Sequence, residues 1–390
     1  MKILVTGMAG FIGHRVAVSF AEAGHFVVGI DYLHNGHCTQ LQQGRLNSCG
    51  IHLNMNDSGV CVNSTTFPRL CLVVVNIENK KKLDELFARE HFDMVLHLAA
   101  KAGVRDSLKT PYSFFRSNSL GFMNVIEACR KFHVRYLFFA SSSSVYGKTS
   151  RIPQKENDDK GMPESFYALT KNHNESTARY YSKMYNMCCV GLRFFTVYGP
   201  WGRPDMAPMI FANAIFKGRH LCLYGNGELK RDFTYIDDVV CAVSEVVRYS
   251  ITKQRTEDEG LFDVFNIGTG RTVEINKFVS VLEDAMGLQV KKNLMPMPKG
   301  DVCQTKADTS KLKKHTGYSC ETTLKSGIML FVKWLFQYYE NITKEVVANK
   351  FQLDVKSINF LLHCLGKYCP KCPTYVWQGG KMSDIFLQTV

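Results

Sequence analysis

The sequence has no long hydrophobic run. Its 390 residues are 45% hydrophobic and 21% charged, as in ordinary globular proteins. No window approaches the roughly 18 consecutive apolar residues of a membrane-spanning helix. The opening MKILVTG passes from one lysine directly into a strand-like run, unlike a signal peptide. We therefore expect no membrane partner and a cytoplasmic location.

The paired cysteine spacings of a disulfide scaffold or zinc site are also missing. The 14 cysteines are scattered along the chain, which predicts reduced thiols. One cluster near the C-terminus holds His363, Cys364, Cys369 and Cys372. Its ligands are too crowded for the two paired spacings usual in zinc sites, so we expect no metal.

Long runs of like charge are absent, although the formal net charge is +13. Such a surface attracts anions such as nucleotides, phosphorylated sugars, nucleic acid or acidic lipid, or it simply keeps the protein in solution. The aromatic-and-glycine motifs of RNA-binding modules are missing. We expect no nucleic-acid partner.

The first 31 residues follow the pattern of a dinucleotide-binding unit. Residues 2–6 and 26–31 are short apolar runs that predict buried strands, and residues 14–23 carry apolar side chains at helical spacing. A glycine-rich segment, GMAGFIG, lies between the first strand and the helix. This order predicts one βαβ unit of a parallel sheet.

The glycines of this unit suit a bound pyrophosphate. Gly7 allows the tight turn, Gly10 lets the backbone approach the phosphates, and Gly13 lets the helix pack on the strand. Asp31 ends the second strand, where a carboxylate bonds a ribose 2′-hydroxyl and repels a 2′-phosphate, which favours NAD over NADP. The residues expected to contact NAD here are Gly7, Gly10, Phe11, Ile12, Gly13 and Asp31.

Strands and helices continue to alternate, which predicts an α/β fold with a Rossmann-type doubly wound parallel sheet. The predicted strands are residues 70–77, 94–100 and 136–140, and the predicted helices are residues 81–89 and 117–133. Residues 32–70 predict a long loop with one helix. Leu98, Ala99 and Ala100 end a strand with small side chains, where a cofactor can lie close.

A run of serines, residues 141–144, follows the fifth predicted strand. Ligands of open α/β sheets bind beyond the carboxyl ends of strands, although a hydroxyl-rich turn is the simpler interpretation of serines alone. Tyr167 and Lys171 favour a ligand site over a simple turn, because residues i and i+4 lie on one face of a helix. A nearby ammonium and a positive nicotinamide favour a phenolate, so we predict that Tyr167 is a base near neutral pH.

These residues resemble the extended short-chain dehydrogenases/reductases of the nucleotide-sugar epimerase group, over about residues 1–335. The resemblance implies NAD on the sheet and a nucleoside diphosphate sugar in a smaller C-terminal α/β lobe. It implies that Ser142, Tyr167 and Lys171 are catalytic, and that Tyr167 and Lys171 also contact the cofactor. The other cofactor contacts that it implies are Asn76, Ile77, Leu98, Ala99, Ala100 and Lys101.

Two segments are very similar to UDP-glucuronate 4-epimerases: residues 192–207, LRFFTVYGPWGRPDMA, and residues 97–105, HLAAKAGVR. This similarity implies that Arg203 holds the sugar carboxylate. Related dehydratases and decarboxylases carry an acid just before Val-Tyr-Gly, where this chain has serines, which favours simple epimerisation. The implied substrate contacts are Arg105, Ser142, Ser143, Ser144, Thr196, Arg203, Arg231 and Asp301.

The chain departs from the usual pattern at three positions: Lys101 replaces a glutamine, Asn76 an aspartate and Lys306 a tyrosine. The expected domains are an NAD-binding domain (1–190), a region that is mainly the sugar-nucleotide lobe, with some segments returning to the first domain (191–340), and an extension of unknown role (341–390). The resemblance also implies a homodimer.

Other functions stay open at this point. They are 4-epimerisation of UDP-glucose, UDP-N-acetylglucosamine or its uronate, decarboxylation of UDP-glucuronate, and non-catalytic dinucleotide binding. Arg203 favours an acidic sugar, and the intact Ser142, Tyr167 and Lys171 set weighs against a non-catalytic role.

Overall fold

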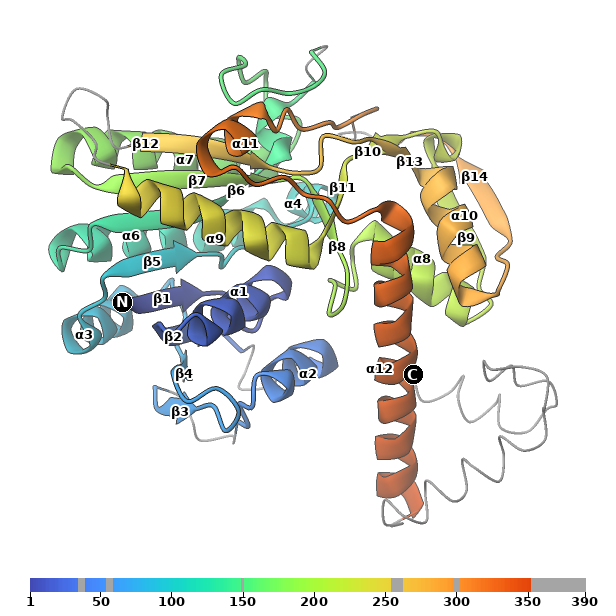
Figure 1. Ribbon diagram of the computed structural model, residues 1–390, viewed down its shortest axis with the longest axis horizontal. Helices are drawn as coiled ribbons and strands as arrows, with labels where there is room; N and C mark the ends of the chain where they lie inside the picture. The colour runs from blue at the N-terminus through green and yellow to red at the C-terminus, as the bar shows by residue number, and fades with distance from the viewer. Residues whose placement is uncertain (34–38, 54–58, 149–150, 254–261, 298–301, 352–390) are drawn as a thin grey trace. The chain divides into compact units, whose positions relative to one another are not determined.

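The computed structural model describes residues 1–33, 39–53, 59–148, 151–253, 262–297 and 302–351, with side chains to residue 341. An eight-stranded sheet, in the order β12-β7-β6-β5-β1-β2-β4-β3, organises residues 1–332 (Figure 1). Its strands are β1 Lys2–Thr6, β2 Phe26–Asp31, β3 Cys61–Asn63, β4 Leu70–Val74, β5 Met94–His97, β6 Tyr136–Ser142, β7 Cys188–Phe194 and β12 Phe262–Ile267. All neighbours pair in parallel except β3, which is antiparallel to β4. The predicted doubly wound parallel sheet is confirmed.

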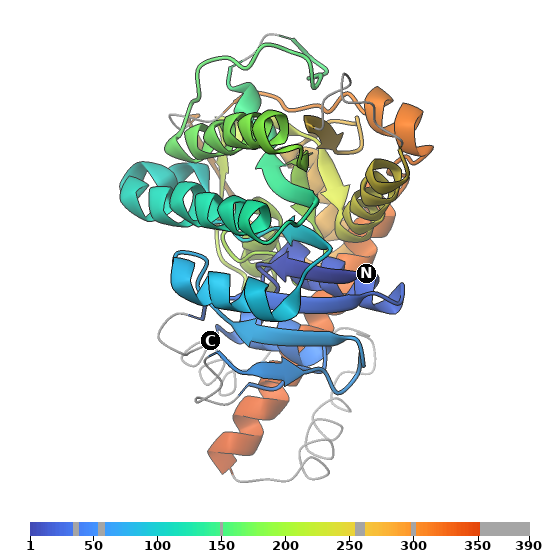
Figure 2. The ribbon, with the colours of Figure 1, turned by 90° about the vertical axis from the view of Figure 1, so that its left-hand side faces the viewer.

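Helices cover both faces of this sheet (Figures 1 and 2). One face carries α1 (Phe11–Glu22), α9 (Ile236–Thr252) and α11 (Ser310–Thr316); the other carries α3 (Lys80–Glu90), α6 (Gly121–Lys131) and α7 (Phe166–Tyr185). The amphipathic pattern of α6 explains its place, because the residues at its i, i+3, i+4 and i+7 positions from Phe122 to Cys129 are all buried.

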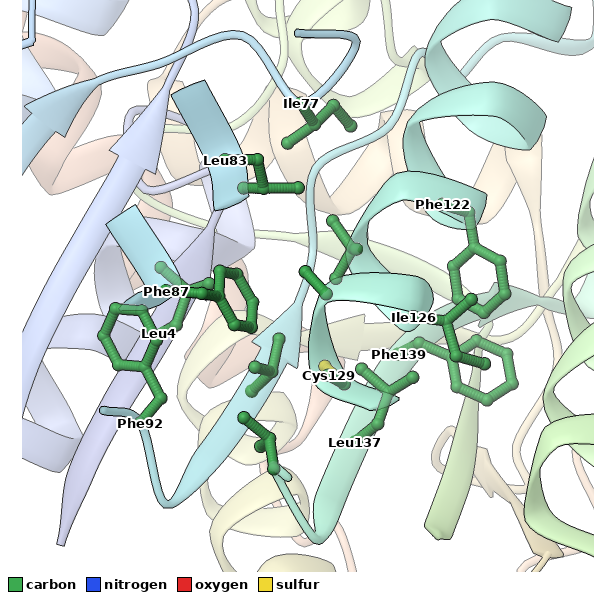
Figure 3. Close-up of a cluster of buried hydrophobic side chains, with 14 of the residues drawn as sticks. Leu4, Ile77, Leu83, Phe87, Phe92, Phe122, Ile126, Cys129, Leu137 and Phe139 are labelled. Atoms are coloured by element: carbon green, nitrogen blue, oxygen red, sulfur yellow. The ribbon is translucent and has the colours of Figure 1, made fainter. Parts of the chain in front are cut away.

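The core beneath α3 and α6 is built from large apolar side chains (Figure 3). Phe122 from α6 meets Phe139 from β6 with ring centroids 5.3 Å apart, and Phe87 from α3 meets Phe92 edge-on at 5.3 Å. Leu4 of β1 lies in the same cluster. This packing fixes β1, β5 and β6 side by side, and so fixes the loops that leave their carboxyl ends.

A group of shorter elements follows β7. They are β8 Thr196–Tyr198, α8 Ala207–Phe216, β9 Leu221–Tyr224, β10 Lys230–Arg231, β11 Phe233–Tyr235, β13 Val273–Glu274, α10 Ile275–Met286 and β14 Lys292–Met295. Their strands form three two-stranded sheets, β8 with β11, β9 with β14 and β10 with β13. Between them, α9 and β12 return to the main sheet.

The segment predicted as a loop with one helix contains α2 (Gln40–Ser48) and also β3. A reciprocal cap starts α2, because Thr39 Oγ1 accepts from Gln42 N at 3.2 Å and Gln42 Oε1 accepts from Thr39 N at 3.0 Å. The strand β3 was missed because it is a three-residue edge strand whose side chains are mostly exposed.

The helix predicted over 117–133 is present to Lys131, but its first turn is π-helical rather than α-helical. Between β5 and α6 the chain forms α4 (Val104–Lys109), α5 (Pro111–Phe114) and this π-helical turn (Phe115–Leu120). Asn118 in the π-helical turn is buried, donates to Lys101 O and accepts from Lys101 N, both at 2.8 Å. The irregular turn thus secures the loop after β5, and such turns occur frequently at functional sites.

The helix α12 runs from Leu324 to Phe351, and from Lys333 onward its residues belong to a second unit. None of the described helices combines the length and hydropathy that a membrane crossing requires. Within the described residues, no cluster of three or more His, Cys, Asp or Glu side chains can hold a metal ion. The C-terminal cluster of His363, Cys364, Cys369 and Cys372 lies outside the described residues.

Candidate active site

A cavity of about 790 Å³ opens at the carboxyl ends of β1, β5, β6 and β7. It lies where the strand order reverses, since β1 is flanked by β2 on one side and by β5 on the other. Most residues predicted to bind or react line it: Gly7, Gly10, Phe11, Ile12, Gly13, Leu98, Ala100, Lys101, Ser142, Ser143, Ser144, Tyr167, Lys171, Thr196, Arg203 and Arg231. The structure therefore brings the cofactor, catalytic and substrate sets into one site.

Five predicted contacts do not line this cavity: Asp31, Asn76, Ile77, Ala99 and Arg105. The Ala99 backbone packs against the glycine loop, because a Cβ built on Gly7 would come within 2.8 Å of Ala99 N and Cα. A further predicted contact, Asp301, lies outside the described residues.

The glycine loop has no room for side chains. Gly7 has φ +76°, a conformation that glycine adopts without strain. A Cβ on Gly13 would come within 1.9 Å of Gly7 O, and one on Gly10 would come within 2.9 Å of the same atom. Since α1 begins at Phe11, its free N–H groups open onto the cavity beside bare backbone, which fits the pyrophosphate of a dinucleotide.

Asp31 is engaged by the backbone around this loop. Its Oδ2 accepts from Ala9 N at 2.7 Å, and its Oδ1 accepts from Tyr32 N at 2.8 Å. Burial raises the pKa of this carboxyl to about 6, although both backbone N–H groups and Arg45 oppose the shift. Each carboxylate oxygen keeps capacity for a second donor such as a ribose hydroxyl.

Asn76 and Ile77 serve local structure. Asn76 Oδ1 accepts from Glu78 N at 2.9 Å, which leaves its amide group partly committed to a turn. Ile77 is buried, and its side chain fills the space beside Gly121, where a Cβ would come within 2.6 Å. Their contact with the cofactor remains a prediction.

Tyr167 and Lys171 lie on the first turns of α7, which begins after Ser165. The Ser165 Oγ accepts from Ala168 N at 3.1 Å and caps the helix. Lys171 Nζ donates to Ala140 O at 2.7 Å and lies 5.9 Å from the centre of the Tyr167 ring. Ser142 ends β6, and its Oγ accepts from Ser144 Oγ at 3.0 Å.

Burial is the largest influence on the pKa values of both Tyr167 and Lys171. Burial raises the pKa of the Tyr167 phenol, while a hydrogen bond from Ser142 and the charge of Arg203 oppose that rise. Burial also lowers the pKa of Lys171 to about 8, against the opposing effect of Glu175. Arg203, rather than Lys171, is the cation that lowers the Tyr167 pKa here, and the Lys171 ammonium donates to the Ala140 carbonyl. A phenolate favoured by Lys171 and a bound nicotinamide together stays a prediction.

Arg203 reaches the cavity but already has partners. Its Nε and Nη2 donate to the two Asp205 oxygens at 3.1 and 2.5 Å, and Nη2 also donates to Ala102 O at 2.8 Å. Arg105, by contrast, lies with its guanidinium 4.2 Å from the centre of the Tyr224 ring. A contact between Arg105 and the substrate stays a prediction.

Sequence reasoning missed the carboxylate beneath this site. Glu175 is one helical turn beyond Lys171 and accepts from Ser141 Oγ at 2.6 Å. Arg193 donates to both Glu175 oxygens at 2.8 Å, and Lys160 Nζ lies 2.5 Å from one of them. The i+4 spacing from Lys171 was the only sequence signal for this residue, and the partners from β7 and the 151–165 segment came from tertiary structure.

Comparisons with known proteins agree with this geometry. Residues 3–268 match the NAD dependent epimerase/dehydratase family. The chain is 39% identical to Protein CapI of Staphylococcus aureus (87% of this chain, 100% of the relative) and 36% identical to UDP-glucuronate 4-epimerase 2 of Arabidopsis thaliana (89% and 79%). It is also similar to the crystal structure of UDP-glucuronic acid 4-epimerase from Bacillus cereus in complex with UDP-glucuronic acid and NAD. That match has a TM-score of 0.75 and 31% identity, and covers 87% of this chain and 100% of the other.

Proposed function

The chain belongs to the NAD-dependent epimerase/dehydratase family, and we propose that it is a UDP-glucuronate 4-epimerase, which interconverts UDP-glucuronate and UDP-galacturonate. The observation that carries the proposal is the shared cavity of Tyr167 and Arg203, close enough that the Arg203 charge acts on the Tyr167 pKa. A base and a carboxylate-binding cation then face one sugar ring.

The cofactor residues fit NAD. Gly7, Gly10 and Gly13 give a bare loop at the N-terminus of α1 for the pyrophosphate, and Asp31 ends β2 where a ribose lies in this fold. The chemistry that NAD supplies when bound is removal of a hydride from C4 of the sugar and its return to the opposite face.

Proton transfer belongs to Tyr167. Its phenol takes the proton of the sugar 4-hydroxyl as the ketone forms and gives it back as the ketone is reduced. Ser142 holds the same oxygen and the Tyr167 hydroxyl, while Lys171 fixes the helix turn through the Ala140 carbonyl and adds positive charge to the site. The charge of a bound nicotinamide adds to that of Arg203 in favouring the phenolate.

Arg203 protects the intermediate. A ketone at C4 is β to the C6 carboxylate, so the intermediate can lose carbon dioxide. A bidentate grip by a guanidinium holds the carboxylate out of the orientation required for that loss. The serine turn after β6 offers no acid for elimination or decarboxylation, which weighs against a decarboxylase.

The test of substrate class is an Arg203→Met variant assayed with two sugars. We expect its affinity for UDP-glucuronate to fall at least tenfold, while its affinity for UDP-glucose changes less than threefold. Any remaining turnover of UDP-glucuronate should release UDP-pentose. Equal losses for both sugars would contradict a carboxylate-specific role, and would favour a neutral UDP-sugar as the substrate.

We also propose a homodimer in the cytosol. Exposed apolar side chains gather on the π-helical turn, α6 and α7, and include Phe115, Leu120, Met123, Leu169, Tyr180 and Met184. The ten described cysteines are free thiols, as suits a reducing compartment. A Leu169→Glu, Met184→Glu double variant should change the mass measured by light scattering from dimer to monomer, and a monomeric parent would contradict the proposal.

A further inference from the structure

A buried arginine outside the predicted catalytic set joins two walls of the cavity. Arg45 lies near the end of α2, is 5% exposed and lines the cavity. Its Nη1 donates to Ala9 O at 3.0 Å, in the glycine loop. Its Nε and Nη2 donate to Trp201 O at 3.1 and 2.8 Å. One guanidinium thus ties the glycine loop to the turn that leads to Arg203.

The turn at Trp201 needs such support. Trp201 has φ +65°, a left-handed conformation that a residue with a bulky side chain rarely adopts. Its indole lies against the backbone of α2, because a Cβ built on Gly44 would come within 2.3 Å of the ring. Gly44 and Arg45 are neighbours, so α2 holds both the ring and the carbonyl of the strained residue.

The position of Arg203 depends on this turn, which it follows by two residues. Arg45 Nη2 also approaches Gly202 O at 3.3 Å, so the carbonyls of both residues before Arg203 are held. We propose that Arg45 is a positioning residue that sets the direction of Arg203 toward the sugar carboxylate. This inference rests on the function proposed above and adds α2 to the elements that determine substrate specificity.

The geometry requires arginine. The planar guanidinium spreads its N–H groups toward carbonyls on opposite sides, Ala9 on one and Trp201 on the other. A lysine has one compact ammonium group and cannot reproduce this fork. Arg45→Lys therefore keeps the positive charge but cannot bond the Ala9 and Trp201 carbonyls at the same time. Gly44→Ala keeps Arg45 and displaces the Trp201 ring.

The test compares affinities of these two variants for UDP-glucuronate and UDP-glucose, measured by calorimetry on the NAD-loaded protein. We expect at least a tenfold loss for UDP-glucuronate and less than a threefold loss for UDP-glucose. In an Arg203→Met background, Arg45→Lys should give no further loss for UDP-glucuronate. A purely structural role would weaken both ligands equally, or would add its full effect to that of Arg203→Met, and either result would overturn the inference.

The parent protein separates the two proposals. If it binds UDP-glucuronate no better than UDP-glucose, the proposed function fails, and the positioning role fails with it. If the parent prefers UDP-glucuronate and both variants keep that preference, only the role of Arg45 is lost. Thermal melting of each variant shows that the protein measured is folded, and the ratio of the two affinities is unaffected by a fraction of inactive protein.

Discussion

Replacing Glu175 with glutamine should destabilise the protein strongly, because this carboxylate is the partner of a buried cation. The Arg193 and Glu175 side chains are 2% and 1% exposed, and two N–H···O distances of 2.8 Å join them. Ser141 and Lys160 donate to the same carboxylate. Glutamine keeps the shape, but it removes the charge and turns an N–H group toward these donors.

The magnitude follows from the pKa of Glu175. Burial alone would raise it, but the hydrogen bonds and charges of Arg193 and Lys160 outweigh burial and lower the pKa from 4.5 to about 2. At about 1.36 kcal/mol per pKa unit, this difference corresponds to roughly 3 kcal/mol. Breaking a buried ion pair by removing one partner costs about 3–5 kcal/mol, which agrees. Because the folded pKa is the lower one, this stabilisation is present above pH 4.5 and is lost as the pH falls toward 2.

Thermal unfolding at neutral pH checks this prediction. With an unfolding entropy of about 2.1 cal/mol/K per residue over residues 1–332, a loss of about 3–5 kcal/mol lowers the melting temperature by roughly 4–7 °C. Glu245→Gln is the control, because its partner Arg248 is exposed and an exposed ion pair contributes little to stability. A Glu175→Gln variant that melts within 1 °C of the Glu245→Gln control would refute the reasoning.

Three further changes probe the cofactor loop and the sugar pocket. Gly13→Ala should abolish NAD retention, because the added Cβ would collide with the backbone of the glycine loop. The control Gly161→Ala should retain NAD, because a Cβ there meets its nearest atom at an ordinary 3.5 Å. Equal amounts of NAD released from the two denatured variants would contradict this. The affinity for NAD, measured by calorimetry, should fall as the pH drops below about 6, where Asp31 becomes protonated. Asp31→Asn should remove this pH dependence, and a variant with the same pH dependence as the parent would argue against a contact between Asp31 and the ribose. Asp205→Asn should tighten UDP-glucuronate binding several-fold and leave UDP-glucose binding unchanged, because it frees Arg203 from its partner; weaker UDP-glucuronate binding would contradict this.

Local patterns in the sequence were enough to predict the parallel sheet and most of the cavity lining. The glycine loop, the serine turn and the Tyr167-Lys171 pair are each encoded within a few residues, so their chemistry could be inferred before their arrangement was known. Edge strands and irregular turns were harder to predict, as β3 and the π-helical turn show, because they depend on neighbours that are distant in the sequence.

The supporting residues could not be predicted in this way. Arg45 gains its role only when α2 meets the Trp201 turn, 156 residues later in the chain. Glu175 gains its role from Arg193 and Lys160, which the sequence separates from it by other elements. The opposing effects on the Tyr167 pKa likewise depend on burial and on Arg203, neither of which a motif records.

The central claim is that the protein epimerises a UDP-uronate with a cofactor that it retains. The most direct test is to incubate the purified protein with UDP-glucuronate, without added NAD, and to follow the sugar by proton NMR. The account predicts that UDP-galacturonate rises to a plateau and that no pentose forms. Formation of UDP-xylose, or no reaction even after NAD is added, would contradict it.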